Sequence, residues 1–561
     1  MNIKKRMIPR FLCYLALPFL LISCGISKSL KDVPDLSAYN SDITQRIQLS
    51  DTTFVAGESF LTKNKQRLWE FYVTGDPLER GLLTGHLTQE LFHTQEHVFL
   101  SKVNELVPSK TKQNLLRKFL AWFNRKMYLH VPEEYKAEIY GLSRYASDTY
   151  NHIADPYLRI LYLHGAHDIG HALQDLALVG CSSFAAWGDK TEDGSLIIGR
   201  NFDFYAGDDF AKEKIIAFTA PNQGHKFMSV TWGGMIGVVS GMNEHGLTVS
   251  INAGKSKIPL IAKTPISIVT REILQYASTI EEAVAIAKKR QVFVSESIFV
   301  GSAKDKKAIL IEVSPKNFGV YEVPNSNQLI CSNHFQSKPY ANDKKNKAHI
   351  KESHSQYRYE RMQELLHQSP KLTPKIAVDI LRNKEGLANK EIGYGNEKAL
   401  NQLLAHHAIV FKPEQRLVWV SSNPYQLGEF VGYDLNKIFK NSYKNAKNTT
   451  LADPHLTIEK DSFQYTTAYK NYERYRQLKD TISTAINTKK SLSPDILKNI
   501  QDSNPEYWKA YFIAGRYYEQ QKNYIAALRA FQQAITKEIT TFQDQQKIES
   551  YIKKLKRKVK K

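Results

Sequence analysis

Apolar residues recur at a helical spacing before residue 179 and at a strand spacing after it. Segments such as NLLRKFLAWFN and YLRILYLHGAH carry apolar positions at i, i+3 and i+4, which predicts a helical region over 61–180. From residue 179 the period shortens, and CSSFAAWGDKTEDGSLIIGRNFDF predicts two strands joined by a turn at Asp193-Gly194. Residues 24–60 are polar and weakly patterned, and we expect a tether there.

Strands and helices alternate in blocks through the middle of the chain. Short apolar runs predict strands within 215–254, 296–333 and 406–422. Helical spacing predicts helices at 264–277, 280–290, 355–368 and 373–382. Strands flanked by blocks of helices are typical of packed sheets with helices outside, so we expect an α+β domain over 181–448.

The last part of the chain, 449–561, is helical and polar. WKAYFIAGRYYEQQKNYIAALRAFQQAI resembles a single tetratricopeptide repeat through Tyr511, Gly515, Tyr518, Ala527 and Phe531, although a plain helical hairpin is the alternative. One repeat cannot bury its own face, so helices at 463–486 and 540–558 are expected to supply neighbours. We predict a separable module that binds a protein partner.

The N-terminus predicts export. A basic segment precedes the 12-residue apolar run Phe11 to Ile22, which has the length of a signal sequence rather than of a membrane span. The following Leu-Ile-Ser-Cys-Gly resembles a bacterial lipobox and predicts a signal peptide over 1–23 with lipid on Cys24. An ordinary cleaved signal with an incidental cysteine is the alternative. Two or more lipid chains anchor a protein stably, so we expect a lipid-anchored protein of the bacterial cell envelope.

Composition narrows the class of protein. The 561 residues are 42% hydrophobic with four Cys, which excludes a disordered chain and a disulfide scaffold. The net charge of +21 falls to +17 without the signal, and the last eleven residues hold seven Lys or Arg. That tail is typical of a solvated helix end, or of contact with anionic lipid. We expect no nucleic-acid partner for an exported lipoprotein.

Five motifs in order carry the chemistry. Gly180-Cys181 opens the first strand, Arg200-Asn-Phe-Asp203 follows, GMNEHGLTVSINAG contains Asn252, CSNHF contains Asn333, and SQYRYERM contains Arg358. Together they resemble the N-terminal nucleophile (Ntn) hydrolases, in the branch of penicillin acyltransferases, choloylglycine hydrolases and acid-ceramidase-like amidases. The resemblance implies a four-layer αββα sandwich, with 61–180 kept as a helical leader or α-subunit.

The resemblance also implies a role for each motif residue. The chain would cut itself between Gly180 and Cys181, and the new α-amino group would act as the base for the thiol. Asp203 would orient that amino group, and Arg200 would favour the thiolate. Asn252 and Asn333 would donate to the oxyanion, and Arg358 would support the site.

Each of these residues has a structural alternative. In that alternative, Cys181 is a buried core residue, and Arg200 and Asp203 form a structural ion pair. Asn252 and Asn333 are then ordinary residues at strand ends and turns. Arg361, one turn after Arg358, competes with it. Cys331 lies two residues from Asn333 on a strand and is expected to pack beneath the site. Cys181 and Cys331 are the thiols left after export, and they can pair only if neither is catalytic.

A histidine-rich segment precedes the nucleophile. His164, His167 and His171 share a helical face with Asp168 nearby, which is a plausible zinc arrangement. The Ntn resemblance requires no metal or other cofactor, so we expect a structural or propeptide-docking role instead.

The predicted function is therefore a self-processing amidohydrolase or acyltransferase. Its substrate would be a linear amide such as an N-acyl amino acid or amine, with an apolar pocket formed by Phe204, Tyr205, Trp232 and Met235. A bile-salt or phospholipase-B-like hydrolase remains an alternative. So does a non-catalytic lipoprotein that binds partners through its C-terminal helices.

Overall fold

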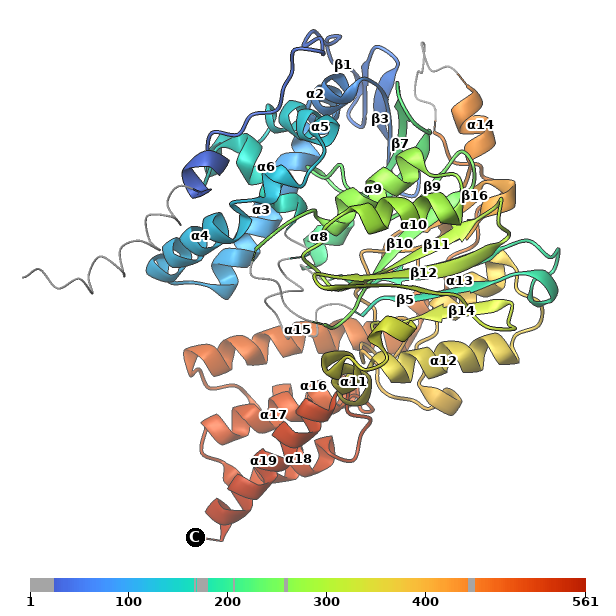
Figure 1. The fold of residues 1–561 in the computed structure, drawn as a ribbon. Helices are drawn as coiled ribbons and strands as arrows, with labels where there is room; N and C mark the ends of the chain where they lie inside the picture. The colour runs from blue at the N-terminus through green and yellow to red at the C-terminus, as the bar shows by residue number, and fades with distance from the viewer. Residues whose placement is uncertain are drawn as a thin grey trace, which may run out of the picture.

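Two β-sheets pack face to face, with helices on both outer sides (Figure 1). The computed structural model describes residues 25–165, 168, 180–204, 207–256, 261–441 and 450–560. The four-layer α+β arrangement expected from the sequence is confirmed. Cys24 and the rest of the predicted signal lie outside the described residues. No helix in the described ranges is both long and apolar enough to cross a membrane.

The smaller sheet has six strands and carries the predicted nucleophile at its start. Its spatial order is β14 (Gln328–Cys331), β5 (Ser182–Ala186), β6 (Ile197–Phe202), β15 (His407–Lys412), β16 (Leu417–Ser421) and β17 (Phe430–Asp434). All neighbouring strands are antiparallel, and β5 pairs β6 with Ser183 opposite Arg200.

The larger sheet joins the N-terminal part of the chain to its centre. Its order is β1 (Ile47–Ser50), β2 (Thr53–Ala56), β3 (Ser59–Lys63), β4 (Trp69–Gly75), β7 (Ile215–Pro221), β8 (Phe227–Thr231), β9 (Ser240–Asn243), β10 (Leu247–Ala253), β11 (Glu296–Ser302), β12 (Lys307–Ser314) and β13 (Asn317–Tyr321). Strand β4 pairs β7 in parallel over seven residue pairs. The first four strands therefore belong to the same sheet as the catalytic domain.

Two sequence predictions are corrected here. Residues 47–56, expected within a tether, contain strands β1 and β2, and residues 61–75, expected to be helical, contain the end of β3 and all of β4. Strand β4 has Trp69, Phe71 and Val73 on one face, but Leu68, Phe71 and Tyr72 also fit the helical spacing i, i+3, i+4, so the pattern was ambiguous. Within 61–180, the first helix begins at Pro77.

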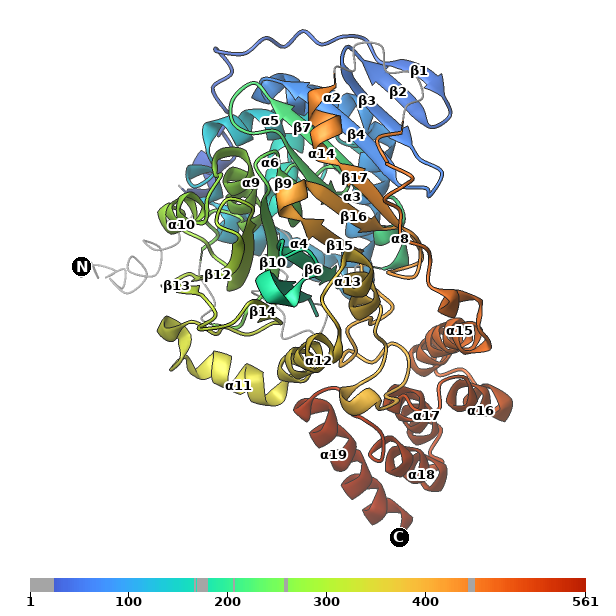
Figure 2. The ribbon, with the colours of Figure 1, turned by 90° about the vertical axis from the view of Figure 1, so that its right-hand side faces the viewer.

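The core lies between the sheets, and a second apolar layer covers each outer face. Ile198 and Ile409 of the smaller sheet meet Phe218 and Leu310 of the larger one. Helices α9 (Ile266–Tyr276) and α10 (Ile280–Lys289) cover the larger sheet, and α12 (Ser355–Gln368) and α13 (Pro374–Leu381) cover the smaller one (Figure 2). These four helices lie within two residues of the predicted ranges.

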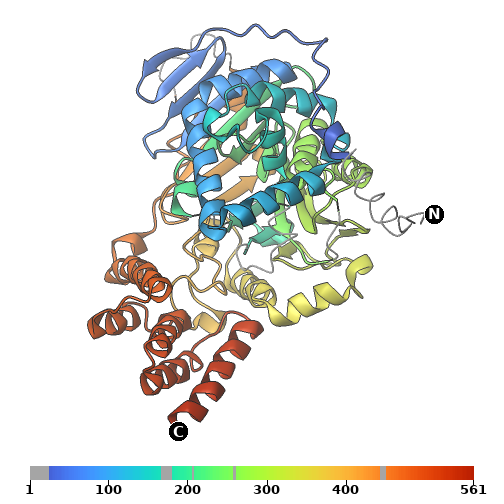
Figure 3. The same cartoon turned by 90° about the vertical axis from the view of Figure 1, so that its left-hand side faces the viewer.

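The helices of the leader cover one side of the larger sheet (Figure 3). They are α2 (Pro77–Leu87), α3 (Gln89–Leu106), α4 (Lys110–Asn124), α5 (Glu133–Ser143) and α6 (Pro156–His164). Helix α2 begins with a capping box between Asp76 and Glu79. Buried Glu138 of α5 accepts from Arg80 of α2 at 2.7 Å and from Arg271 of α9 at 3.2 Å. The leader is thus bonded to the catalytic domain through its interior.

Five helices form the C-terminal region. They are α15 (Thr467–Thr488), α16 (Pro494–Ser503), α17 (Trp508–Gln520), α18 (Tyr524–Ala534) and α19 (Phe542–Val559). Helices α17 and α18 pack where the sequence suggested, with Gly515 against the Phe531 ring and Ala527 fully buried. Leu403 and Leu427 of the catalytic domain belong to the same apolar cluster. The region therefore shares a core with the catalytic domain, which argues against the separable module that we expected.

Candidate active site

Cys181 lies immediately before β5, buried at 1% exposure beside the guanidinium of Arg200. Its Sγ is 3.8 Å from Arg200 Nη2. Arg200 reaches this position from β6 and is fixed by donating to Ser240 Oγ at 2.5 Å and to the Ile251 carbonyl. Burial raises the pKa of the Cys181 thiol to about 11, and the positive charge of Arg200 opposes that rise. In the uncut chain the thiol is therefore protonated at neutral pH.

Asp203 follows β6 and is fully buried next to the Gly180-Cys181 peptide. Its backbone carbonyl accepts from the Gly180 amide at 3.1 Å. Neither carboxylate oxygen has a hydrogen-bond partner among the described residues. Burial raises the pKa of Asp203 to about 8, although Arg358 and Arg200 both favour its charged form. A buried acid without a partner is costly, so a cationic group at this position would stabilise it.

Arg358 of α12 holds the backbone around the nucleophile. Its Nη1 donates to the Cys181 carbonyl at 2.6 Å and to Ser182 Oγ at 2.8 Å, and its Nη2 donates to Asn333 Oδ1 at 2.5 Å. Arg361, the competing candidate, turns away from the site and pairs with Glu364 at 2.6 Å. The structure thus brings Arg358, and not Arg361, to Cys181.

The two predicted oxyanion donors lie between the sheets and are both engaged. Asn252 Nδ2 donates to the carbonyls of Cys331 and Ser332 at 3.3 Å each. Asn333 Nδ2 donates to the Ala253 carbonyl at 3.0 Å. These bonds connect the end of β10 to the segment after β14. In the uncut chain, both amide groups therefore bond to backbone carbonyls of the opposite sheet.

Gln402 is a site residue that the sequence analysis missed. Its Nε2 donates to the Gly180 carbonyl at 3.1 Å. A Cβ at Gly180 would lie 2.4 Å from that same nitrogen, so glycine is required there for the contact. No motif surrounds Gln402, which lies in a loop before β15, and only the folded chain brings it to Gly180.

A second group missed from the sequence lies behind Arg200. Ser240 Oγ is 2.9 Å from His407 Nε2, and His407 Nδ1 is 2.9 Å from His406 Nδ1. Burial lowers the pKa of both imidazoles, so they are neutral at pH 7. Ser240 and His407 therefore position the arginine without adding a competing charge.

Aromatic side chains form an apolar wall beside the thiol. Cys181 belongs to the same buried cluster as Trp232 and Met235, and Phe204 packs against it. The Phe210 ring lies 5.1 Å from Trp232 and 5.5 Å from Phe204. Tyr205, the fourth predicted pocket residue, lies outside the described residues.

Helix α3 of the leader adds to this wall. Its Phe99 ring lies 5.3 Å from Phe210, and Val98 packs on the same cluster. The wall is therefore built from both sides of the Gly180-Cys181 bond.

Known proteins share this domain. Residues 190–424 match the family described as "Acyl-coenzyme A:6-aminopenicillanic acid acyl-transferase". This segment contains Arg200, Asp203, Asn252, Asn333 and Arg358. This match supports the resemblance to the N-terminal nucleophile hydrolases, in the branch of penicillin acyltransferases and choloylglycine hydrolases, that the sequence motifs suggested.

Individual proteins similar to this chain match about half of it. An uncharacterized protein of Archaeoglobus fulgidus is 26% identical over 271 residues, 44% of each chain, so the match spans less than half of that relative. An N-acylethanolamine-hydrolyzing acid amidase ortholog of Caenorhabditis elegans is 20% identical, with a TM-score of 0.31 over 44% of this chain and 96% of that one. A mutant conjugated bile acid hydrolase of Clostridium perfringens is 12% identical, with a TM-score of 0.32 over 50% of this chain and 97% of that one.

The remaining candidates lie outside the group of residues around Cys181. Cys331 is a free, buried thiol in the core between the sheets, and Cys181 is free as well. His164 is buried, with Nδ1 2.8 Å from the Ile160 carbonyl and Nε2 accepting from the Ile236 amide at 3.0 Å. Asp168 accepts from the Ile266 amide at 2.8 Å. His164 and Asp168 thus join the leader to the catalytic domain, whereas His167 and His171 lie outside the described residues.

Proposed function

We propose that this protein is a self-processing cysteine Ntn hydrolase that cleaves a linear amide or transfers its acyl group. One observation carries the proposal: the buried carboxyl of Asp203 has no hydrogen-bond partner among the described residues, and the Asp203 backbone is bonded to Gly180, at the peptide bond that would yield an N-terminal ammonium on Cys181. Cleavage after Gly180 supplies that ammonium. The unfavourable burial of Asp203 in the uncut chain is then relieved by an ion pair.

Self-processing requires attack on the Gly180 carbonyl by the thiol that follows it. Sγ adds to the carbonyl carbon, the bond to the Cys181 nitrogen breaks, and that nitrogen takes the thiol proton. Gln402 donates to the carbonyl oxygen, where negative charge develops. Water then hydrolyses the thioester, which frees the Gly180 carboxylate and restores the thiol.

Turnover uses the amino group that processing releases. The α-amine, with an ordinary pKa of about 7.7–8.0, takes the thiol proton, and the thiolate attacks the substrate carbonyl. Arg200 favours the thiolate, and Asp203 pairs with the resulting ammonium. The ammonium gives its proton to the leaving amine, and water or a second amine resolves the thioester. Asn252 and Asn333 are the proposed oxyanion donors, after the departing Gly180 segment has left room for substrate.

The apolar wall suggests the class of substrate. Trp232, Met235 and Phe204 form a surface for an alkyl or aromatic acyl group rather than for a charged one. An N-acyl amino acid or N-acyl amine combines such a group with the linear amide that the acyl-transferase family match favours. We further propose that lipid on Cys24 holds the enzyme at the bacterial cell envelope, close to acylated substrates.

The decisive experiment compares wild type with Cys181→Ala on a denaturing gel. Wild type should give two fragments, with the larger one starting at Cys181 by N-terminal sequencing, whereas Cys181→Ala stays one chain. Cys331→Ala is the matched control and should still be cut. The purified protein is then screened against N-acyl amino acids, N-acyl amines, bile-salt amides and phospholipids by mass spectrometry. An uncut, inactive wild type would favour the non-catalytic lipoprotein instead.

A further inference from the structure

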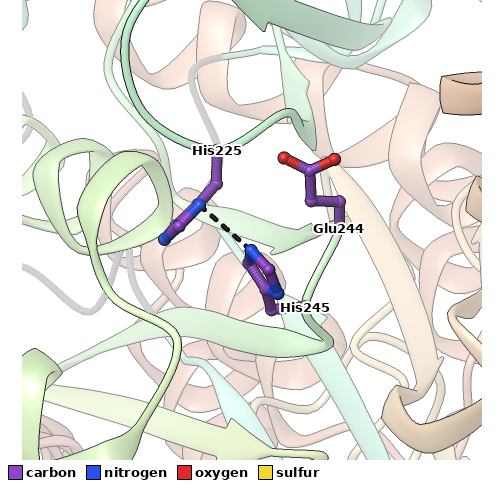
Figure 4. A group of neighbouring side chains, drawn as sticks. All are labelled: His225, Glu244 and His245. Carbon is purple, nitrogen blue, oxygen red and sulfur yellow. Dashed lines mark hydrogen bonds between the residues drawn. The ribbon is translucent and has the colours of Figure 1, made fainter.

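Three side chains with metal-binding chemistry meet beside the turn that joins β9 and β10 of the larger sheet (Figure 4). His225 lies just before β8, and Glu244 and His245 lie in the turn between β9 and β10. One ligand atom from each residue lies within 4.8 Å of the other two. We propose that His225, Glu244 and His245 bind a zinc ion that stabilises this end of the sheet.

The separation of the two imidazoles fits one tetrahedral ion. His225 Nδ1 and His245 Nε2 are 3.1 Å apart. Zinc–nitrogen bonds of about 2.0–2.1 Å at tetrahedral angles place two nitrogen ligands about 3.3 Å from each other. Two His and one Glu form a known zinc ligand set, with water in the fourth position. A direct hydrogen bond between two neutral imidazoles has the same length and is the competing explanation.

Strand pairing brings the two histidines together. The register of β8 and β9 sets Phe227 opposite Asn243. One residue further out, the Glu244 amide donates to the Lys226 carbonyl at 2.8 Å, which brings the neighbouring His225 and His245 to the same place. The arrangement is thus a consequence of the sheet rather than of two mobile side chains meeting at the surface.

Backbone bonds orient the carboxylate from the same side. The Lys226 amide donates to Glu244 Oε1 at 2.9 Å, and the Glu244 amide donates to the Lys226 carbonyl at 2.8 Å. An outer partner of this kind fixes a carboxylate ligand before the metal arrives. Glu244 is half-buried and held near His225 instead of extending freely into solvent.

The turn that carries two of the ligands is locked to helix α9. Asn243 Oδ1 accepts from the amides of His245 and Leu247 at 3.1 and 3.0 Å. Its Nδ2 donates to the carbonyls of Leu274 and Ala277, at and just beyond the end of α9. Because this backbone is already ordered, zinc binding costs little additional conformational entropy.

Distance separates this site from the reaction. Asn252 follows His245 by seven positions, most of them in β10, which corresponds to roughly 23 Å at about 3.3 Å per residue. An ion there cannot touch substrate. It would cross-link the segment before β8 to the β9–β10 turn and thereby raise the stability of the folded chain.

The test titrates zinc sulfate into the full-length Cys181→Ala protein, in which the catalytic thiol cannot compete for metal. Calorimetry should give one strong site per chain, and the melting temperature should rise with zinc concentration. The double variant His225→Gln/His245→Gln should bind at least about a hundredfold more weakly, since loss of outer partners alone costs about 10–100-fold. His455→Gln, which removes an exposed histidine elsewhere, is the matched control and should bind as the parent does.

Three outcomes would overturn the proposal. The first is that the parent protein shows no strong site, which would leave the histidines as a hydrogen-bonded pair only. The second is that the double variant binds zinc as tightly as the parent, which would place the ion elsewhere. The third is that cobalt substituted for zinc fails to give the intense visible absorption of a tetrahedral site.

A turnover assay tests the structural role of the ion separately. Wild-type protein carrying His245→Gln should retain its turnover, and a folded variant that loses turnover would contradict a purely structural ion.

Discussion

Gln402 Nε2 donates to the Gly180 carbonyl at 3.1 Å, across 222 positions of the chain. The next carbonyl, that of Cys181, accepts from Arg358 at 2.6 Å. The two carbonyls that flank the proposed cleavage site are therefore each fixed by a side chain from a different element. A peptide held at both carbonyls has little freedom to move away from the adjacent thiol, which favours attack.

Gln402→Ala should slow self-processing by roughly a hundredfold or more, because it removes one donor to the developing oxyanion. Freshly translated protein is sampled over time, and the two fragments are quantified on a denaturing gel. Gln464→Ala is the matched control, since its Nε2 also donates to a backbone carbonyl, that of Leu427 at 3.2 Å, far from the cut. Equal processing rates for the two variants would remove Gln402 from the reaction.

Asn252→Ala should lower kcat by roughly a hundredfold with a modest change in KM, because an oxyanion contact strengthens in the transition state. The measurement uses fully processed protein, so that defects in cutting and in turnover are separated. Asn252→Asp keeps the shape without the donor and should be similarly slow. A processed Asn252→Ala enzyme with normal kcat would leave Asn252 only a structural role, through its bonds to Ser183 Oγ and to the carbonyls of Cys331 and Ser332.

Asp203 should make the uncut chain less stable as pH rises. Burial raises its pKa from 3.8 to about 8, so the folded chain keeps a proton that the unfolded chain loses near pH 4. The stability that this group contributes is fully present below about pH 4 and is lost as pH rises to about 8. In the Cys181→Ala background, Asp203→Asn should therefore gain melting temperature over the parent progressively across that window. The control Asp51→Asn, at an exposed position, should show no such trend. If the melting temperatures of Asp203→Asn and of the parent changed equally with pH, the raised pKa of Asp203 would be refuted.

Ala527→Trp should destabilise the C-terminal helices by about 1–3 kcal/mol, because Ala527 is fully buried in the cluster that joins α17 and α18. Ile525→Trp on the same helix is the control, since Ile525 is 57% exposed and has room for the ring. Denaturant unfolding followed by far-UV circular dichroism measures the difference. Similar midpoints for the two variants would contradict tight packing of this seam.

The same damage should leave self-processing intact, because the seam lies within the helical region and not at its junction with the catalytic domain. The junction between the helical region and the catalytic domain, by contrast, lies close to Gln402. Tyr472 donates to the Leu403 carbonyl at 3.2 Å, next to Gln402, and buried Glu397 pairs with Lys509. Complete removal of the helices, which the sequence suggested would be harmless, should therefore slow processing through the loop that carries Gln402.

The periodicity of apolar residues was sufficient to predict helices and strands whose structure depends mainly on their own sequence. The strands after Cys181 and helices α9, α10, α12 and α13 follow their periodicity, and the order of the five motifs predicted which polar residues meet. Strand β4 was missed because Leu68, Phe71 and Tyr72 also fit a helical spacing, which hides the alternation of Trp69, Phe71 and Val73. Gln402, Ser240 and His407 were missed because their positions depend on contacts between distant parts of the chain, which no spacing records.

The parallel pairing of β4 with β7 has a consequence for how the protein folds and whether it can refold. If the chain is cut after Gly180, one continuous sheet is shared by two polypeptides, and the buried ion pair of Glu138 with Arg271 joins them. The chain would then fold once, as a unimolecular event before the cut. Any later refolding would be bimolecular, because the two separate polypeptides would have to associate in solution. Recovery after denaturation would fall with dilution, and the mature enzyme would persist through slow unfolding rather than through the ability to fold again.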